Sequence, residues 1–300
     1  MDVSIAESRF YVYNERMGIE EDHCHEFKGH RNVSVEELPP WSFIKGRSGD
    51  KLHRSRRAVS RTLCGLLNSG EGGTVYMGVT DDGVARGMRI QLYQRDHMIV
   101  SLRDLMSRFS PPIHDSMIQV VFVPVLASGE SQKKWLDKLH KSDATLGKAA
   151  NTRAKQHKLR SYEYCWCDVE TEAMIDCSDW LPTFVIELSV RKRKITPEVI
   201  VPAAVNWPDM KLLKKAEILP VYEDEEGKCY CRGQGGLFQY PAQEVKSNTQ
   251  VLMSSHYLPI IERLRSQLHQ ARFILKYTPE PMTDEEFRKK IVQSNDFYES

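Results

Sequence analysis

Apolar and polar positions along the chain follow two periods, one typical of strands and one typical of helices. Short, largely apolar runs of β-forming residues bounded by turn residues predict strands, and these cover residues 10–13, 26–28, 74–79, 118–125 and 184–190. Apolar residues at helical spacing predict amphipathic helices, and these cover residues 58–68, 91–109, 257–277 and 285–292. A late hairpin is expected over residues 229–237.

The same pattern divides the chain into three parts. We expect an N-terminal strand and extension over 1–16, a core domain over 17–250 and a C-terminal helical segment over 251–300. Within the core, 128–162 has few apolar residues, many basic ones and no clear period. Such composition favours a mobile basic insertion, with a short helix around Trp135 to Leu139.

Composition excludes some classes of protein. Lysine and arginine number 42 against 41 acidic residues, so the chain as a whole is not a basic nucleic-acid protein. Seven cysteines without a regular framework favour a reduced intracellular compartment, cytoplasmic or alternatively nuclear. The first residues resemble no secretory leader, and no run is long and apolar enough to span a bilayer.

Candidate chemistry begins with Glu26 and Lys28, which share one face of their predicted strand because they are two residues apart. Asp81 follows the strand over 74–79. Carboxylates from two strands hold a hard cation such as Mg²⁺ or Mn²⁺, and a lysine stabilises charge that develops on a phosphate. Glu21 joins this set only if the chain turns between it and Glu26, since five residues separate them.

Each of these features also has a plain structural interpretation. Glu26 and Lys28 are typical of a solvated strand edge, and Asp81 of an exposed turn. The glycines over 70–73 precede a strand and lack the Gly-x-x-x-x-Gly-Lys-[Ser/Thr] pattern, so they do not predict a nucleotide phosphate loop.

Local basic runs favour a phosphate backbone as partner, with aromatic residues that stack on bases. The cationic candidates for RNA binding are Lys51, Arg54, Arg56, Arg57, Arg61, Arg191, Lys192, Arg193 and Lys194, beside the basic stretch over 133–160. The stacking candidates are Trp41, Trp135 and Tyr162. Taken singly, each run is also typical of a solvated face.

Cysteine spacing leaves a zinc site open. Cys165-x-Cys167 and Cys229-x-Cys231 would form a four-sulfur Zn²⁺ site if their strands adjoin. The alternative is four buried strand cysteines, because cysteine is among the most buried residue types. His23, Cys24 and His25 are a second, weaker metal candidate.

Two stretches together resemble the Schlafen family, in particular its short Schlafen-like members with an AlbA-type domain. The first is Glu21 followed by Glu26-Phe27-Lys28. The second consists of residues 60–69 (SRTLCGLLNS) and 72–83 (GGTVYMGVTDDG). A looser similarity continues to about residue 250, outside the insertion.

The resemblance implies an α+β fold, in which a mixed β-sheet with flanking helices forms one Schlafen-core lobe ahead of the helical tail. It also implies a metal-dependent endoribonuclease acting on structured RNA such as tRNA, or on piRNA precursors as related nematode subunits do. The family's three acidic residues fall on Glu21, Glu26 and Asp81, with Asp82 as an alternative for the last.

The chain departs from longer Schlafens in two ways. Their zinc site uses a His-x-Cys element and an adjacent Cys-Cys pair, whereas only His114 is present in that region here. They pair two lobes, whereas the motif set occurs once here, which predicts a homodimer or a heteromer with another Schlafen-like chain. A non-catalytic RNA-binding or scaffolding subunit of such a nuclease is the alternative function.

Overall fold

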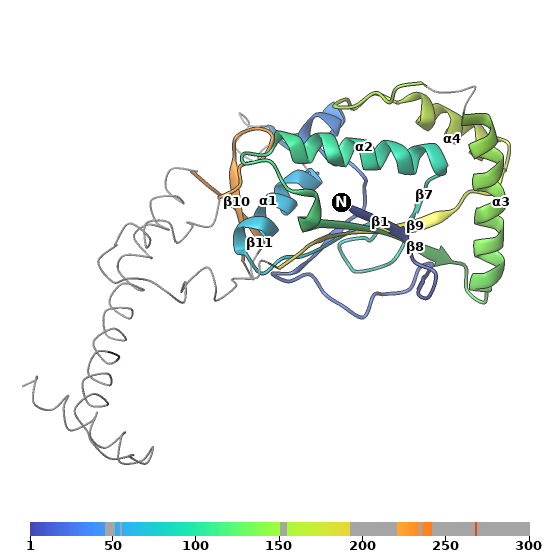
Figure 1. The fold of residues 1–300 in the computed structure, drawn as a ribbon, viewed down its shortest axis with the longest axis horizontal. Coiled ribbons are helices and arrows are strands. Elements are labelled where there is room, and N and C mark those ends of the chain that lie inside the picture. Colours follow the sequence, from blue (N-terminus) through green and yellow to red (C-terminus); the bar gives the residue numbers. More distant parts are fainter. Residues whose placement is uncertain are drawn as a thin grey trace, which may run out of the picture. The chain divides into compact units, whose positions relative to one another are not determined.

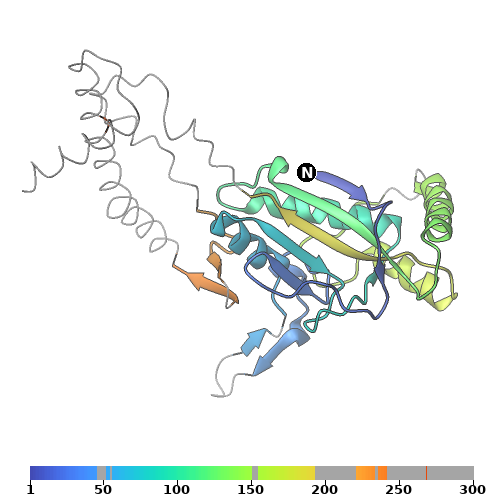
Figure 2. The ribbon, with the colours of Figure 1, turned by 90° about the horizontal axis from the view of Figure 1, so that it is seen from below.

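A mixed β-sheet organises the protein. In this computed structural model the described residues are 1–45, 52–54, 56–150, 155–192, 221–233, 236–241 and 268, and all but Leu268 belong to one compact unit, Met1–Ala242. The main path of the sheet runs β1 (Asp2–Ile5), β8 (Ile118–Leu126), β9 (Thr183–Val190), β6 (Gly73–Met77) and β3 (His25–Lys28). Figure 2 shows these strands side by side. Short strands β2 (Tyr11–Val12) and β7 (Met88–Arg89) pair with β8 and β9.

Strand directions make the sheet mixed. β1 and β2 run parallel to β8, and β3 runs parallel to β6. β9 is antiparallel to β6, β7 and β8. β8 and β9 consist mostly of apolar residues, and most of their side chains on both faces of the sheet are buried. Strands that are covered on both faces typically have such continuous apolar sequences. The predicted α+β fold with a mixed sheet and flanking helices is confirmed.

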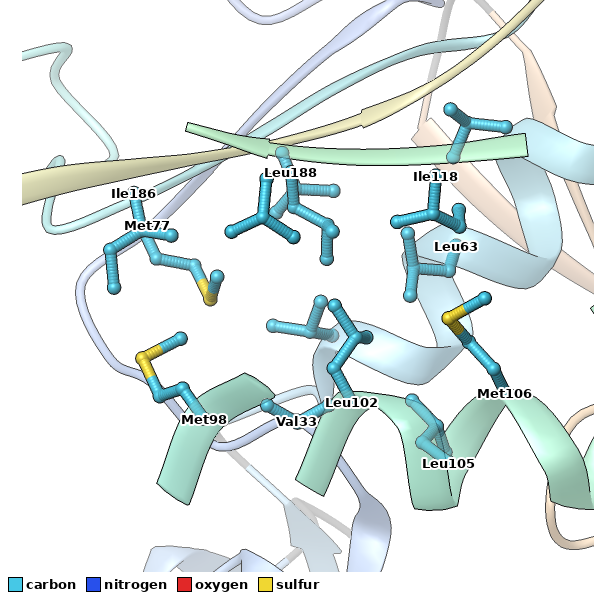
Figure 3. Packing of buried hydrophobic residues seen from close by; sticks show 14 of the residues in the cluster. Val33, Leu63, Met77, Met98, Leu102, Leu105, Met106, Ile118, Ile186 and Leu188 are labelled. Carbon is cyan, nitrogen blue, oxygen red and sulfur yellow. The ribbon is translucent and has the colours of Figure 1, made fainter. Parts of the chain in front are cut away.

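Helices α1 (Val59–Ser69) and α2 (Leu92–Arg108) lie on one face of the sheet (Figure 1). Their apolar stripes meet the core side chains of β6, β8 and β9. Figure 3 shows the contact, in which Leu63 of α1 and Leu102 of α2 point toward Ile118 and Leu188. Burial of such side chains stabilises the fold by about 1.5–3 kcal/mol each. The helices and the strands of this core were all predicted from periodicity.

The opposite face of the sheet carries a smaller apolar cluster and an ion pair whose carboxylate is buried. Phe27 of β3 packs against Tyr76 of β6, with ring centroids 5.8 Å apart. Beside them the carboxylate of Glu187 on β9 accepts two hydrogen bonds from Arg9, at 2.5 and 2.6 Å, and one from Tyr11, at 2.7 Å. The N-terminal segment, predicted as a strand and extension over 1–16, therefore contributes Arg9 and Tyr11 to this face of the sheet.

Helix α3 (Gln132–Ala150) occupies most of the predicted insertion over 128–162. The short helix predicted around Trp135 to Leu139 is therefore present and is longer than predicted. Trp135 and Leu139 are one turn apart and fully buried. The Trp135 ring meets Phe184 of β9 edge-on, at 5.2 Å between centroids. Few apolar residues are enough to hold α3 in place, because only one narrow face of the helix is buried and its other positions carry mostly polar and charged side chains.

Helix α4 (Trp166–Asp176) replaces the strand expected around Cys165 and Cys167. Cys165 immediately precedes the helix, and Asp168 in its first turn accepts a hydrogen bond from the Cys165 amide at 3.0 Å. This bond, from the residue before a helix to a carboxylate three residues later, is typical of a helix N-terminus, and the spacing of the two residues indicates in the sequence where a helix begins. Trp166 and Cys167 therefore sit on a helix and not on a strand.

Two glycines of the 72–83 motif are required by the backbone. Gly73 has φ +146°, and a Cβ there would lie 2.4 Å from the carbonyl oxygen of Cys24. Gly78 has φ +97° and lies against Gly87. A side chain at either position would meet backbone atoms that cannot shift cheaply. These glycines allow the chain around β6 to pack closely against neighbouring backbone, and they have no need of a phosphate ligand to explain them.

A two-stranded hairpin, β10 (Cys229–Gly233) with β11 (Gly236–Tyr240), confirms the hairpin predicted over 229–237. β10 packs along α1. The Asn68 side chain at the end of α1 donates to the carbonyls of Tyr222 and Tyr230, at 2.9 and 2.8 Å, and accepts from the Tyr222 amide at 2.8 Å. Asn68 thereby ties this late segment to the core.

The remaining described elements are short. A second antiparallel pair joins β4 (Phe43–Lys45) and β5 (Leu52–Arg54), and 3-10 turns cover Val35–Glu37, Pro40–Ser42 and Asp115–Met117. The predicted helices over 257–277 and 285–292, and the predicted boundary at residue 250, lie outside the described residues. In the part of the chain that the structure describes, no helix is long and apolar enough to cross a membrane.

Candidate metal centre and RNA-binding groove

The neighbouring parallel strands β3 and β6 bring the candidate residues to one corner of the sheet. Glu26 is paired in register with Val75 and Lys28 with Met77, so both side chains lie on the face that α1 and α2 cover. Lys28 Nζ forms an ion pair with Glu26 Oε1, as their shared strand face predicts. Asp81 follows β6 at the end of the sheet where β3 also ends.

Glu26 is buried between two cations. Its second carboxylate oxygen is paired with Arg232 Nη1 of β10, and Glu26 is only 8% exposed. Arg232 also donates to the carbonyls of Asp22 and His25, at 2.8 Å each. Arg232 thus holds the Glu26 carboxylate and the start of β3 together. We did not predict this role from the sequence, because nothing in the pattern of β10 indicates where the arginine points.

Glu21 reaches β3 through the turn that its position requires. Asp22 Oδ1 accepts from the amides of Cys24 and His25, at 2.7 and 2.8 Å, which bends the chain between Glu21 and the strand. Glu21 Oε1 then accepts from the Phe27 amide at 2.7 Å. The backbone of β3 therefore already engages this carboxylate.

Asp81 and Asp82 lie exposed in the turn after β6. The Thr80 hydroxyl donates to Asp82 and holds the pKa of that carboxyl below its usual value. Asp81 is the more open of the two to a new ligand, since its neighbour is engaged by Thr80. The choice of Asp81 as the third acidic residue, with Asp82 as the alternative, stays a prediction.

The three predicted carboxylates do not form a metal cluster in this arrangement. Within the described ranges, two groups of three or more side chains bring metal-ligating atoms close together: His97, His157, Cys165 and Cys167; and Asp22, His23 and Cys24. Neither group contains Glu21, Glu26 or Asp81. Because both oxygens of Glu26 face cations, Mg²⁺ or Mn²⁺ fits here only after Glu26 exchanges its partners.

A groove with a cavity of about 820 Å³ begins at His30, two residues beyond β3. Trp41, Tyr162 and Tyr164 line it, and their side chains are 71%, 53% and 67% exposed. Two of the three predicted stacking residues, Trp41 and Tyr162, therefore share one surface. The third, Trp135, is 2% exposed and belongs to the core, so its assignment to base stacking is wrong.

Arginine supplies the positive charge of the groove. The Arg56 guanidinium lies over the Trp41 ring, 4.7 Å from its centroid, and Arg89 also lines the groove. Burial, together with the charges of Lys28 and Arg56, lowers the pKa of His30 to about 4. The His30 ring is therefore neutral at pH 7. Of the acidic groups at the groove, Asp168 is paired with Arg31.

The other predicted basic residues have varied positions. Arg57 and Arg191 are exposed, whereas Lys192 is paired with Glu71. Arg61 is paired with Glu226 at 3.0 Å and lies away from the groove lining. Four of the predicted basic residues have no described side chain. For Arg54 only the backbone in β5 is described. The other three, Lys51, Arg193 and Lys194, lie outside the described residues.

The four predicted zinc cysteines fall into two separate places. Cys229 and Cys231 lie on β10 beside α1, where the Asn68 amide is 3.5 Å from Cys229 Sγ. Cys165 and Cys167 lie at the start of α4, with two histidines instead of the second cysteine pair. The strands do not adjoin as the four-sulfur site requires, because Cys165 and Cys167 begin a helix.

His114 does not fit the zinc element of longer Schlafens. Its Nδ1 lies 2.8 Å from the Ser116 hydroxyl, and serine stands where that element has cysteine. Neither metal-ligating group among the described side chains includes His114.

Residues 21–152 match the family described as Schlafen, AlbA_2, a nucleic-acid-related domain family. The match begins at Glu21 and includes β3, α1, β6, α2 and β8. No solved structure matches the chain. Residues 21–152 of this chain thus form a Schlafen-family domain of the AlbA type.

Proposed function

We propose that this chain is a metal-dependent endoribonuclease that acts on structured or small precursor RNA as one lobe of a paired assembly. The observation that carries the proposal is the buried Glu26 carboxylate between Lys28 and Arg232, on the strand next to the one that leads to Asp81. Carboxylates beside cations are the groups that phosphodiester hydrolysis requires. Mg²⁺ or Mn²⁺ bound to them would polarise the scissile phosphate.

RNA itself supplies a reason for Glu26 to change partners. A phosphate that reaches Lys28 and Arg232 competes with Glu26 for the same two cations, because phosphate and carboxylate accept the same charge-assisted hydrogen bonds. Glu26 is then released toward Glu21 and Asp81. In this proposal the pairing seen here is the resting state of the site.

The groove beside β3 is the proposed RNA-binding surface. The chain leaves Lys28 and enters the groove at His30, so a strand of RNA held there passes close to the Glu26 corner. Trp41 and Tyr162 are exposed and offer ring surface to bases, while Arg56, which lies over one face of Trp41, and Arg89 supply positive charge for the RNA backbone. Base stacking on an aromatic side chain contributes about 1–3 kcal/mol and tolerates any sequence.

Trp41→Ala is expected to weaken RNA binding about tenfold, because it removes one stacking platform from the groove. The salt dependence of binding should stay nearly unchanged, since no charge is lost, whereas Arg56→Glu should reduce the slope. Fluorescence anisotropy with a labelled single-stranded RNA over a salt series measures both. Phe10→Ala is the matched control, as Phe10 is also exposed but lies outside the groove lining. Equal affinity for the parent chain and Trp41→Ala would exclude the groove.

Glu26→Gln is expected to reduce RNA cleavage about 100-fold or more, because it removes the charged oxygen while keeping the size of the side chain. The assay uses a panel of tRNA, hairpin and single-stranded RNA with Mg²⁺ or Mn²⁺. It is run with the chain alone and with a second Schlafen-like chain. Glu15→Gln is the control, since Glu15 is exposed and is not one of the candidate carboxylates. Cleavage by Glu26→Gln at the parental rate would refute the assignment.

A non-catalytic RNA-binding or scaffolding subunit is the second candidate, and one observation favours it. Both oxygens of Glu26 are already paired with cations, as in a structural ion pair. In that case the parent chain binds RNA in the groove without cutting it. Cleavage then appears only when a different Schlafen-like chain is added, and Glu26→Gln leaves that cleavage unchanged.

A further inference from the structure

Two histidines and two cysteines meet where α2, the segment 155–160 and the start of α4 come together (Figure 1). His97 lies on α2, His157 lies in the segment, and Cys165 and Cys167 lie at the first turn of α4. One metal-ligating atom of each side chain lies within 4.8 Å of those of the other three. Both cysteines are buried, at 1% and 0% exposure. Four ligands from three segments thus surround one point.

The spacing of these atoms matches a tetrahedral metal site. His97 Nδ1 lies 3.3 Å from Cys167 Sγ, and His157 Nδ1 lies 3.6 Å from Cys165 Sγ. With Zn–S about 2.3 Å and Zn–N about 2.0 Å, a tetrahedral ion places its nitrogen and sulfur ligands about 3.6 Å apart. Little movement of the side chains is therefore required to admit an ion.

The groups around the four ligands orient them toward a metal. His157 Nε2 is 3.1 Å from Asp96 Oδ2, which directs Nδ1 inward, as carboxylates do for metal-binding histidines. The Lys158 amide donates to Cys165 Sγ at 3.3 Å. Cys165 immediately precedes α4, which fixes its position at the end of the helix. The Trp166 ring stacks on His157, with 5.1 Å between centroids.

We propose that His97, His157, Cys165 and Cys167 bind one structural zinc ion that joins α4 and the segment 155–160 to α2. Two sulfur and two nitrogen ligands select zinc over the hard cation expected at Glu26. Four protein ligands leave no open position for a substrate, so the ion is structural and not catalytic. His97 and Asp168 also line the RNA-binding groove. The zinc ion therefore fixes one wall of that groove, yet the site stands whether or not the chain cleaves RNA.

The full chain, produced in cells supplied with zinc, is expected to hold about one zinc ion per chain by elemental mass spectrometry. Cobalt exchanged into the same protein should give the visible bands and sulfur charge-transfer absorption of a tetrahedral thiolate site. The Cys165→Ser/Cys167→Ser variant should lose most of the zinc. Cys177→Ser is the matched control, because Cys177 is an exposed cysteine at the other end of α4, and it should keep the zinc.

A second variant and a second measurement cover the case in which the double variant does not fold. His157→Cys keeps four ligands, so it should retain zinc and shift the cobalt spectrum toward a three-sulfur site. X-ray absorption of the parent chain should show two sulfur and two nitrogen neighbours around zinc. A parent chain without zinc, zinc unchanged in the folded double variant, or a zinc ion without sulfur neighbours would each overturn the proposal.

Discussion

Replacing Arg232 by methionine is expected to lower the free energy of unfolding by about 3–5 kcal/mol, because the buried Glu26 carboxylate loses one of its two cations and two buried carbonyls lose their donor. Arg232 is paired with Glu26 and also donates to the carbonyls of Asp22 and His25. Methionine keeps most of the length and apolar contact of the side chain but can donate nothing. The loss therefore falls on the charge and hydrogen bonds and not on packing.

A double-mutant cycle separates these contributions. Glu26→Gln should cost less stability in the Arg232→Met background than in the parent chain, because one of the two ion pairs of Glu26 is already lost there, and the difference is the coupling energy of the Glu26–Arg232 pair. Chemical denaturation followed by circular dichroism measures all four proteins. Arg191→Met, at an exposed arginine, should change stability by less than about 0.5 kcal/mol. A loss below about 1 kcal/mol in Arg232→Met would mean that the ion pair is solvated and not buried.

Trp135→Ala is expected to cost about 3–5 kcal/mol, because it opens a large cavity under α3. The Trp135 ring meets both Phe184 of β9 and Trp180, with centroids 5.2 and 5.8 Å away. The same denaturation experiment measures the change. In contrast, Trp41→Ala should leave stability nearly unchanged, since Trp41 is 71% exposed. Similar stability losses in the two variants would contradict the core position of α3.

Elements with a strong local period were predictable from the sequence. α2 buries residues that recur at helical spacing and β9 buries a nearly continuous run, so the apolar pattern of each element is clear in the sequence. Only a short helix around Trp135 to Leu139 was predicted within α3, because the buried face of this helix consists of little more than these two residues among lysines. α4 was missed because Cys165-Trp166-Cys167 has the composition of a buried strand, while the signal of a helix start lies in the Asp168 side chain.

In the candidate site, too, contacts between residues near in sequence were predictable and contacts between distant residues were not. The Glu26–Lys28 pair follows from strand spacing alone, and the structure confirms the shared face. Arg232 lies 206 residues beyond Glu26, so no local pattern connects them. The proposed zinc site shows the same limit, because Cys165 and Cys167 are two residues apart in the sequence while His97 is brought to them by α2.

The most direct measurement of the central claim is the rate of RNA cleavage in a single turnover, with the chain saturated by RNA and Mg²⁺ or Mn²⁺ present. Saturation separates chemistry from binding, so a difference between proteins reports the Glu26 corner and not the groove. The parent chain and Glu15→Gln, each with its partner lobe, are expected to cut the RNA at the same rate. Glu26→Gln is expected to bind equally well and to cut it about 100-fold more slowly or not at all. Equal cleavage by all three proteins would contradict the account.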